Sequence, residues 1–157
     1  MNEEEYADIR VRQIKASEAH TTSKPSEVTD IFWIFAKRQA ADEYPPATDN
    51  SGKWLLFVPV EQIDATWSVV KQATEEGRLG SSSKVATAKP NSHASNPAMK
   101  VICVYTYDWT AEADVRRIRQ ELRTMGFLQK IAYKANEDTR QGRYSNSGGT
   151  RISKYYE

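Results

Sequence analysis

Residues 100–107, KVICVYTY, constrain the fold more than any other segment of this chain. A run so rich in β-branched and aromatic residues fits a pleated, partly buried surface and predicts a strand. Asp108 or Thr110 then caps a helix that runs to about Met125, because its apolar residues recur at helical spacing before Gly126. Residues 128–135 return as a strand. The chain therefore finishes as strand, helix, strand.

The middle of the chain repeats this alternation. Residues 53–60, KWLLFVPV, are apolar almost throughout and predict a strand that ends or lies at an edge near Pro59. Residues 61–76 predict a helix, since Ile63, Trp67 and Val70 fall on one stripe and Gly77 follows. Residues 80–89 predict a further strand after a polar turn.

The ends of the chain carry weaker patterns. Residues 27–41 predict a helix, because Val28, Ile31, Phe32 and Phe35 lie at i, i+3, i+4 and i+7. Residues 1–26 are polar and predict an extended or flexible lead-in. The tail from Asn136 is polar and rich in glycine, which favours a mobile loop.

These elements predict one α+β domain over residues 27–157, preceded by the lead-in of residues 1–26. The order of elements implies a mostly antiparallel sheet with helices packed on one face. A chain of 157 residues fits one domain of this size.

Composition narrows the functional classes. No apolar run approaches the roughly 20 residues that span a bilayer, and the acidic start does not resemble a secretory signal. The single cysteine, Cys103, excludes a disulfide framework within the chain and is best interpreted as a buried hydrophobe. We therefore expect a cytoplasmic protein.

Motifs for metal or cofactor chemistry are absent from the sequence. It has no Walker phosphate loop, no paired-glycine dinucleotide motif and no zinc spacing, so we expect no cofactor and no metal. His20 and His93 both lie in polar segments typical of solvated loops.

Positive charge is unevenly distributed. Residues 78–100 hold four basic and no acidic residues, and residues 130–157 hold six basic and three acidic ones. Segregated charge of this kind produces a local positive field although the net charge is only +1. Arg, Lys and Ser together suit a phosphate group. The candidate phosphate-binding residues are Arg78, Ser82, Lys84, Lys89, Tyr133, Lys134, Arg140, Arg143 and Tyr144.

Three segments resemble the family known as basophilic-leukaemia-expressed protein: residues 52–56 (GKWLL), residues 77–85 (GRLGSSSKV) and residues 133–144, which contain Tyr-Lys, Asp-Thr and Gly-Arg-Tyr. The similarity covers roughly residues 27–157. It implies the fold of the eukaryotic mRNA cap-binding initiation factor, a curved antiparallel sheet with helices on its convex side.

The likeness to the cap-binding factor carries further implications. Lys53 and Lys89 fall near positions where the factor holds the phosphate chain, and the loop that corresponds to a stacking tryptophan holds Tyr44 with Glu43 beside it. Val28 to Lys37 resembles the first helix of the factor. Trp33 would then lie on a helix that contacts a protein partner.

Three functions remain open. The first is a module that binds a phosphorylated ligand, either a nucleotide or an RNA end. The second is a β-elimination enzyme, because residues 130–143 resemble bacterial phosphothreonine lyases; Lys84 or Lys89 would be the base if its pKa were lowered. The third is a protein-interaction module that acts through the Trp33 helix.

Overall fold

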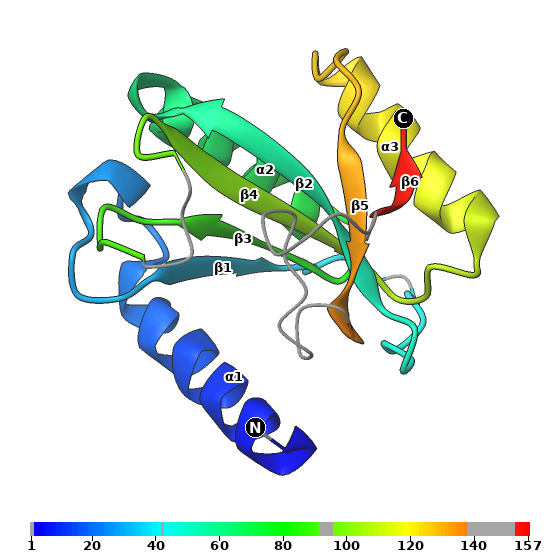
Figure 1. Cartoon of the computed structure of the whole chain (residues 1–157), viewed down its shortest axis with the longest axis horizontal. Helices are drawn as coiled ribbons and strands as arrows, with labels where there is room; N and C mark the ends of the chain where they lie inside the picture. Colours follow the sequence, from blue (N-terminus) through cyan, green and yellow to red (C-terminus); the bar gives the residue numbers. More distant parts are fainter. Residues whose placement is uncertain (1, 42, 92–95, 138–152) are drawn as a thin grey trace.

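The computed structural model describes residues 2–41, 43–91, 96–137 and 153–157. Its centre is a six-stranded, curved sheet in the order β1-β3-β4-β2-β5-β6, and every neighbouring pair is antiparallel (Figure 1). The predicted α+β class and antiparallel sheet are confirmed. The strands are β1 (Trp33–Lys37), β2 (Gly52–Pro59), β3 (Ser82–Ala86), β4 (Met99–Thr106), β5 (Ala132–Ala135) and β6 (Ser153–Tyr156). The helices are α1 (Glu3–Ser17), α2 (Ile63–Glu75) and α3 (Glu112–Thr124).

The pairing of β2 with β4 forms the middle of the sheet. It runs without a break from Gly52 opposite Thr106 to Pro59 opposite Met99. Successive side chains of a strand point to opposite faces. Trp54, the next residue after Lys53, is fully buried on the face that α2 and α3 cover. Lys53 therefore points to the other face, which we call the open face.

Helices α2 and α3 cover the first face and enclose the core. Their apolar stripes bury Trp67 and Val70 from α2, and Ile118 and Leu122 from α3. Burying such a side chain stabilises the fold by about 1.5–3 kcal/mol. The indole Nε1 of Trp54 also donates a hydrogen bond of 3.0 Å to the carbonyl of a residue in α3, which ties this helix to the sheet.

The predicted helix over residues 27–41 is wrong. Residues 33–37 form strand β1, which pairs with β3 from Trp33 opposite Ala86 to Lys37 opposite Ser82. Ile34 and Ala36 enter the core while Trp33 and Phe35 lie on the open face. The helical spacing in this segment does not reflect its structure. Its β-branched and aromatic residues suit a strand, and this strand pairs with β3. Trp33 therefore lies on a strand, and the helix expected to contact a protein partner there does not form.

The chain ends also differ from expectation. Residues 3–17 form α1 rather than an extended segment, and the Asn2 side chain caps this helix reciprocally with Glu5. The guanidinium of Arg10 lies 4.8 Å from the ring centre of Tyr105, so α1 contacts the open face. Strand β6 was not expected within the polar tail. It pairs with β5 at the edge of the sheet.

Arg119 connects α3 to the last strand. Arginine is rarely buried, yet Arg119 is only 1% exposed. Its guanidinium donates to the carbonyls of Glu157, Phe127 and Gln129 at 2.8–2.9 Å. Buried polar groups are satisfied in this way. Arg119 thereby holds the turn after α3 and the end of β6 together.

Replacing Arg119 tests this role. Arg119→Leu leaves three carbonyls without their donor, so we expect a loss of about 3 kcal/mol in the free energy of unfolding, measured by chemical denaturation. Arg123→Leu removes the same charge one turn later, and we expect a change within about 0.5 kcal/mol. Equal losses in the two variants would contradict a structural role for Arg119.

Candidate functional site

Three lysines from three strands share the open face, and we call Lys53, Lys84 and Lys134 the lysine cluster. Lys53 of β2 stands directly opposite Lys134 of β5 and, on its other side, opposite Tyr105 of β4. Lys84 of β3 stands opposite Cys103, two residues before Tyr105 on β4. The register of the sheet therefore brings these lysines to one face although they are distant in sequence.

Two members of the cluster are buried. Lys53 is 6% exposed and Lys134 is 7% exposed, which is rare for lysine. The Lys53 ammonium donates a hydrogen bond of 3.0 Å to the side-chain oxygen of Asn136. Asn136 in turn donates to the Ser51 hydroxyl at 2.9 Å, so the acceptor is fixed. This arrangement sets the direction of the Lys53 side chain.

Burial lowers the pKa of Lys53 from 10.5 to about 7. The removal of water is the largest cause, and the charges of Lys84, Lys134 and Arg10 lower it further. Cys103 acts in the opposite direction, with a larger effect than any single one of these three charges. At neutral pH the side chain therefore exists in both protonation states, and a nearby negative charge would favour the protonated one.

Aromatic rings lie among these cations. The Lys84 ammonium is 3.8 Å from the ring centre of Trp33, and Arg10 lies over Phe35 and Tyr105. Trp33 is half-buried, whereas Phe35 and Tyr105 are buried. The open face thus combines positive charge with π surfaces, the two components that hold nucleotides and single-stranded nucleic acids.

Each residue of the Gly52-Lys53-Trp54 motif has a structural role. A Cβ on Gly52 would lie 2.5 Å from the hydroxyl oxygen of Tyr133, so only glycine allows this close approach. Tyr133 needs the space because its hydroxyl shares a hydrogen bond of 2.6 Å with Thr106 in the core. The motif therefore places Lys53 on the open face between Gly52, which must remain glycine, and Trp54, which is buried in the core.

The other predicted site residues within the described part of the chain are dispersed. Arg78 forms an ion pair of 2.7 Å with Glu121 of α3, on the side of the sheet that the helices cover. The Lys89 ammonium lies over the ring of Phe32, beyond the end of β3. Tyr133 is fully buried in the core. Ser82 shares the open face with Lys84, two residues before it on β3.

Some expectations fall outside the described residues, namely those for Arg140, Arg143, Tyr144 and His93. His20 lies in a short 3-10 turn, where its ring nitrogens contact Ser23 and Asp30. Arg10 was missed entirely, since nothing in a polar helix indicates which residue reaches a sheet.

Three further aromatic residues have structural contacts. Trp54 and Trp67 are buried in the core. The Tyr44 hydroxyl donates to Asp114 at 2.6 Å, and its ring packs edge-on against Tyr107. Tyr44 therefore joins its loop to α3. Trp33, whose ring lies beside Lys84 of the lysine cluster, is the aromatic residue best placed to contact a ligand on the open face.

A family model described as Basophilic leukemia-expressed protein Bles03 matches residues 46–138. The chain belongs to this family. The matched region of the Bles03 family includes all three members of the lysine cluster, and it excludes α1 and β6.

A crystal structure of a schistosome eIF4E, in complex with m7GpppA and 4E-BP, has a similar fold. The TM-score is 0.58 at 17% sequence identity, and the alignment covers 90% of this chain and 78% of the other. This Bles03 family member therefore has the expected fold of the cap-binding factor. Within the residues that the structure describes, no helix is long and apolar enough to cross a membrane.

The lowered pKa of Lys53 makes stability depend on pH in a defined direction. Below about pH 7 the side chain is protonated in both the folded and unfolded states, and the folded state carries the full cost of the buried charge. Between about 7 and 10.5 only the unfolded state retains the proton, so this contribution to stability rises with pH, by at most about 1.4 kcal/mol per pH unit.

We expect Lys53→Met to lose this dependence. In chemical denaturation between about pH 7 and 10.5, the unfolding free energy of wild type should increase relative to that of the variant as the pH rises. Lys24→Met, an exposed lysine before β1, controls for the loss of a lysine elsewhere. A constant difference between wild type and Lys53→Met would contradict the lowered pKa.

Proposed function

We propose that the open face binds a phosphorylated ligand, either a nucleotide or an RNA end, through the lysine cluster. The observation that carries this proposal is the convergence of Lys53, Lys84 and Lys134 from three strands on one face. Like charges placed opposite one another destabilise a sheet, and Lys53 and Lys134 are such a pair. Perturbed charges of this kind gather at binding and catalytic sites more often than elsewhere.

A phosphate suits the electrostatics of the cluster. Its oxygens accept charge-assisted hydrogen bonds from ammonium groups, and these are stronger where water is excluded. Its negative charge would raise the pKa of Lys53 by offsetting the charges that lower it. The ligand should therefore bind together with a proton, and its affinity should fall as the pH rises above about 7.

The aromatic residues favour a nucleotide over inorganic phosphate. Trp33 lies beside Lys84 and is half-buried, so a base on this side of the face would find a ring next to a cation. The schistosome eIF4E of similar fold was crystallised with m7GpppA, itself a nucleotide with a phosphate chain. These two observations support the nucleotide or RNA end as the ligand class.

Isothermal titration against a cap analogue, ATP, a phosphothreonine peptide and a short RNA tests the proposal. We expect Lys84→Gln and Lys134→Met each to weaken the nucleotide by roughly 10- to 100-fold, since a hydrogen bond to a charged group contributes about 1.5–3 kcal/mol. Lys89→Gln removes the same charge outside the cluster and should change affinity little. Equal losses of affinity in Lys84→Gln and Lys89→Gln would show that the lysine cluster does not form the binding site.

The pKa of Lys53 also favours a second candidate, a β-elimination enzyme. An unprotonated amine at neutral pH can abstract the α-proton of a phosphothreonine, after which the C–O bond breaks, phosphate leaves and a C=C bond forms. Lys53 suits this role better than Lys84 or Lys89, because it is the buried lysine whose pKa is lowered to about 7.

Mass spectrometry of a phosphothreonine peptide after incubation with the protein tests this second candidate. The enzyme hypothesis expects a product that has lost phosphoric acid with wild type and none with Lys53→Met. Intact peptide with both proteins would leave binding as the function of the open face.

A further inference from the structure

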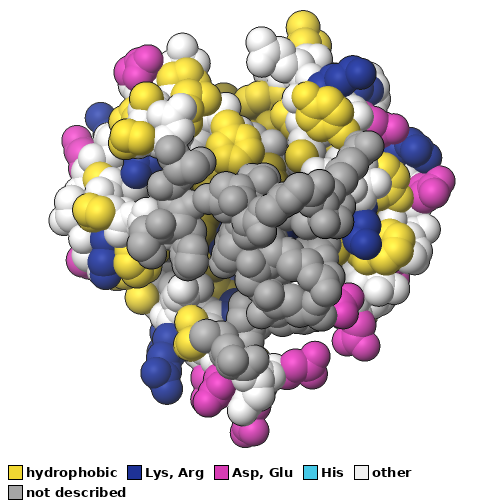
Figure 2. Space-filling view, in the orientation of Figure 1, with side chains coloured by type: hydrophobic (Ala, Val, Ile, Leu, Met, Phe, Trp, Pro, Cys, Tyr) yellow, Lys and Arg dark blue, Asp and Glu magenta, His cyan; other side chains and the backbone are white. Residues whose placement is uncertain are grey.

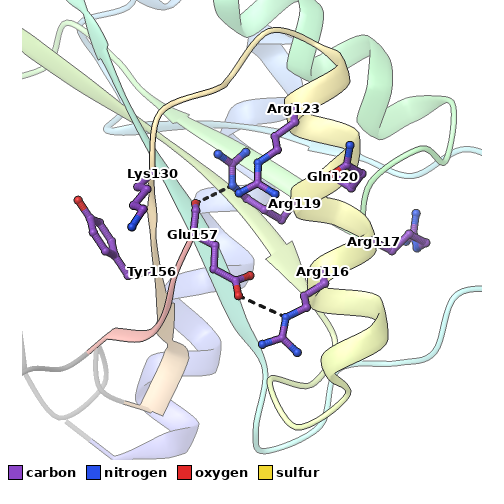
Figure 3. Close-up of a pocket in the computed structure, with 8 residues that line it drawn as sticks. All are labelled: Arg116, Arg117, Arg119, Gln120, Arg123, Lys130, Tyr156 and Glu157. Atoms are coloured by element: carbon purple, nitrogen blue, oxygen red, sulfur yellow. Dashed lines mark hydrogen bonds and ion pairs between the residues drawn. The ribbon is translucent and has the colours of Figure 1, made fainter.

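A second basic surface lies away from the lysine cluster, at the end of edge strand β6. A groove of about 620 Å³ is lined by Arg116, Arg119 and Arg123 of α3, together with Lys130, Tyr156 and Glu157. Figure 3 shows the three arginines on one side of Glu157, and Lys130 with Tyr156 on the other. In Figure 2, Lys and Arg side chains lie over α3 on the right of the view, with Asp and Glu side chains between them. We call this surface the α3 groove.

The α3 groove carries a strong excess of positive charge. Its lining, which also includes Arg117, contains five basic side chains and one carboxylate, that of Glu157. Glu157 lies 3.3 Å from Arg116, which also pairs with Glu112. The acids present therefore neutralise one end of the groove and leave the other end positive.

The positive end consists of Arg119, Arg123 and Lys130. Arg119 is fixed by its three carbonyl acceptors, and the charge of Arg123 helps to lower the Arg119 pKa, after the larger effect of burial. The guanidinium of Arg123 has no hydrogen-bond or ion-pair partner among the residues that the structure describes. The charge of Glu157 offsets only part of the charge of these two guanidinium groups, and their proximity suits an anionic ligand.

Spacing and chemistry select the kind of anion. Arg123 and Lys130 line the groove from opposite sides of Glu157 (Figure 3), and two separated charges suit an extended chain of phosphates more than a single ion. Tyr156 adds an aromatic ring that is 54% exposed, with the Lys130 ammonium 5.9 Å from its centre. A row of cations beside an exposed aromatic ring is the arrangement that binds single-stranded nucleic acid.

We propose that the α3 groove binds a segment of single-stranded RNA, with phosphates on Arg123 and Lys130 and a base on Tyr156. Arg119 supplies a fixed positive charge beneath the strand, because each of its three side-chain nitrogens already donates to a carbonyl. This site is independent of the ligand proposed for the lysine cluster, since it uses different residues at a different edge of the molecule.

Fluorescence anisotropy with a short labelled oligouridine, at several salt concentrations, tests the groove. The double variant Arg123→Gln with Lys130→Gln removes two charges without breaking an ion pair of the described residues. We expect at least about tenfold weaker binding at low salt. The slope of log K against log salt should fall by about 1.4, which is twice the value of about 0.7 for each phosphate contact of a single strand.

Two matched variants make the result specific. Arg12→Gln with Lys24→Gln removes two exposed charges elsewhere and should leave affinity and slope near those of wild type. Tyr156→Ala should weaken binding about 5- to 100-fold through lost stacking, whereas Tyr156→Phe should retain it.

Several results would overturn the proposal. They are equal losses in the two double variants, no effect of Tyr156→Ala, or an acidic peptide that competes as well as unlabelled RNA. The RNA could instead lose affinity in the cluster variant Lys134→Met and bind normally to the double variant Arg123→Gln with Lys130→Gln. That result would overturn the proposed RNA site in the α3 groove and leave the open-face proposal intact. The opposite pattern would support the groove alone.

Discussion

The pairing of β2 with β4 is the constraint on which the site depends. It extends over the full length of both strands, and Trp54 anchors it by packing in the core and bonding to α3. Once Trp54 faces the core, the period of two along a strand fixes Lys53 on the opposite face. A shift of register by one residue would bury Lys53 in the core and expose Trp54. The hydrophobic effect that stabilises the sheet therefore also places the central lysine.

The lysine cluster places like charges next to one another in the sheet, which works against stability. Burial of Lys53 and Lys134 next to each other costs free energy, and the fold offsets that cost through its apolar core on the other face. Sites that break a general rule of stability in this way are common where a protein binds or reacts. Arg119 is a buried cation whose three side-chain nitrogens each donate to a backbone carbonyl, and it stabilises the fold.

The elements with strong patterns could be predicted from the sequence, and those that depend on distant partners could not. The strand with Trp54 follows from its apolar run, and the helices with Trp67 and Ile118 follow from local periodicity. Strand β1 was taken for a helix because its helical spacing is visible locally while its partner, β3, is about fifty residues away. Of the site, Lys84 and Lys134 were found because they stand in basic strands, and Lys53 through the family resemblance. Their convergence depends on strand order and register, which the sequence does not contain in any single segment. Arg10 gave no local indication at all.

The most direct test of the central claim is an NMR titration of the Lys53 side chain, with and without a nucleotide that carries a phosphate chain. We expect a pKa of about 7 in the free protein and a clear rise when the ligand is bound. Assignment of the signal by Lys53→Met makes the result specific to this residue. A pKa near 10.5 in the free protein, or one that the bound ligand leaves unchanged, would contradict the account.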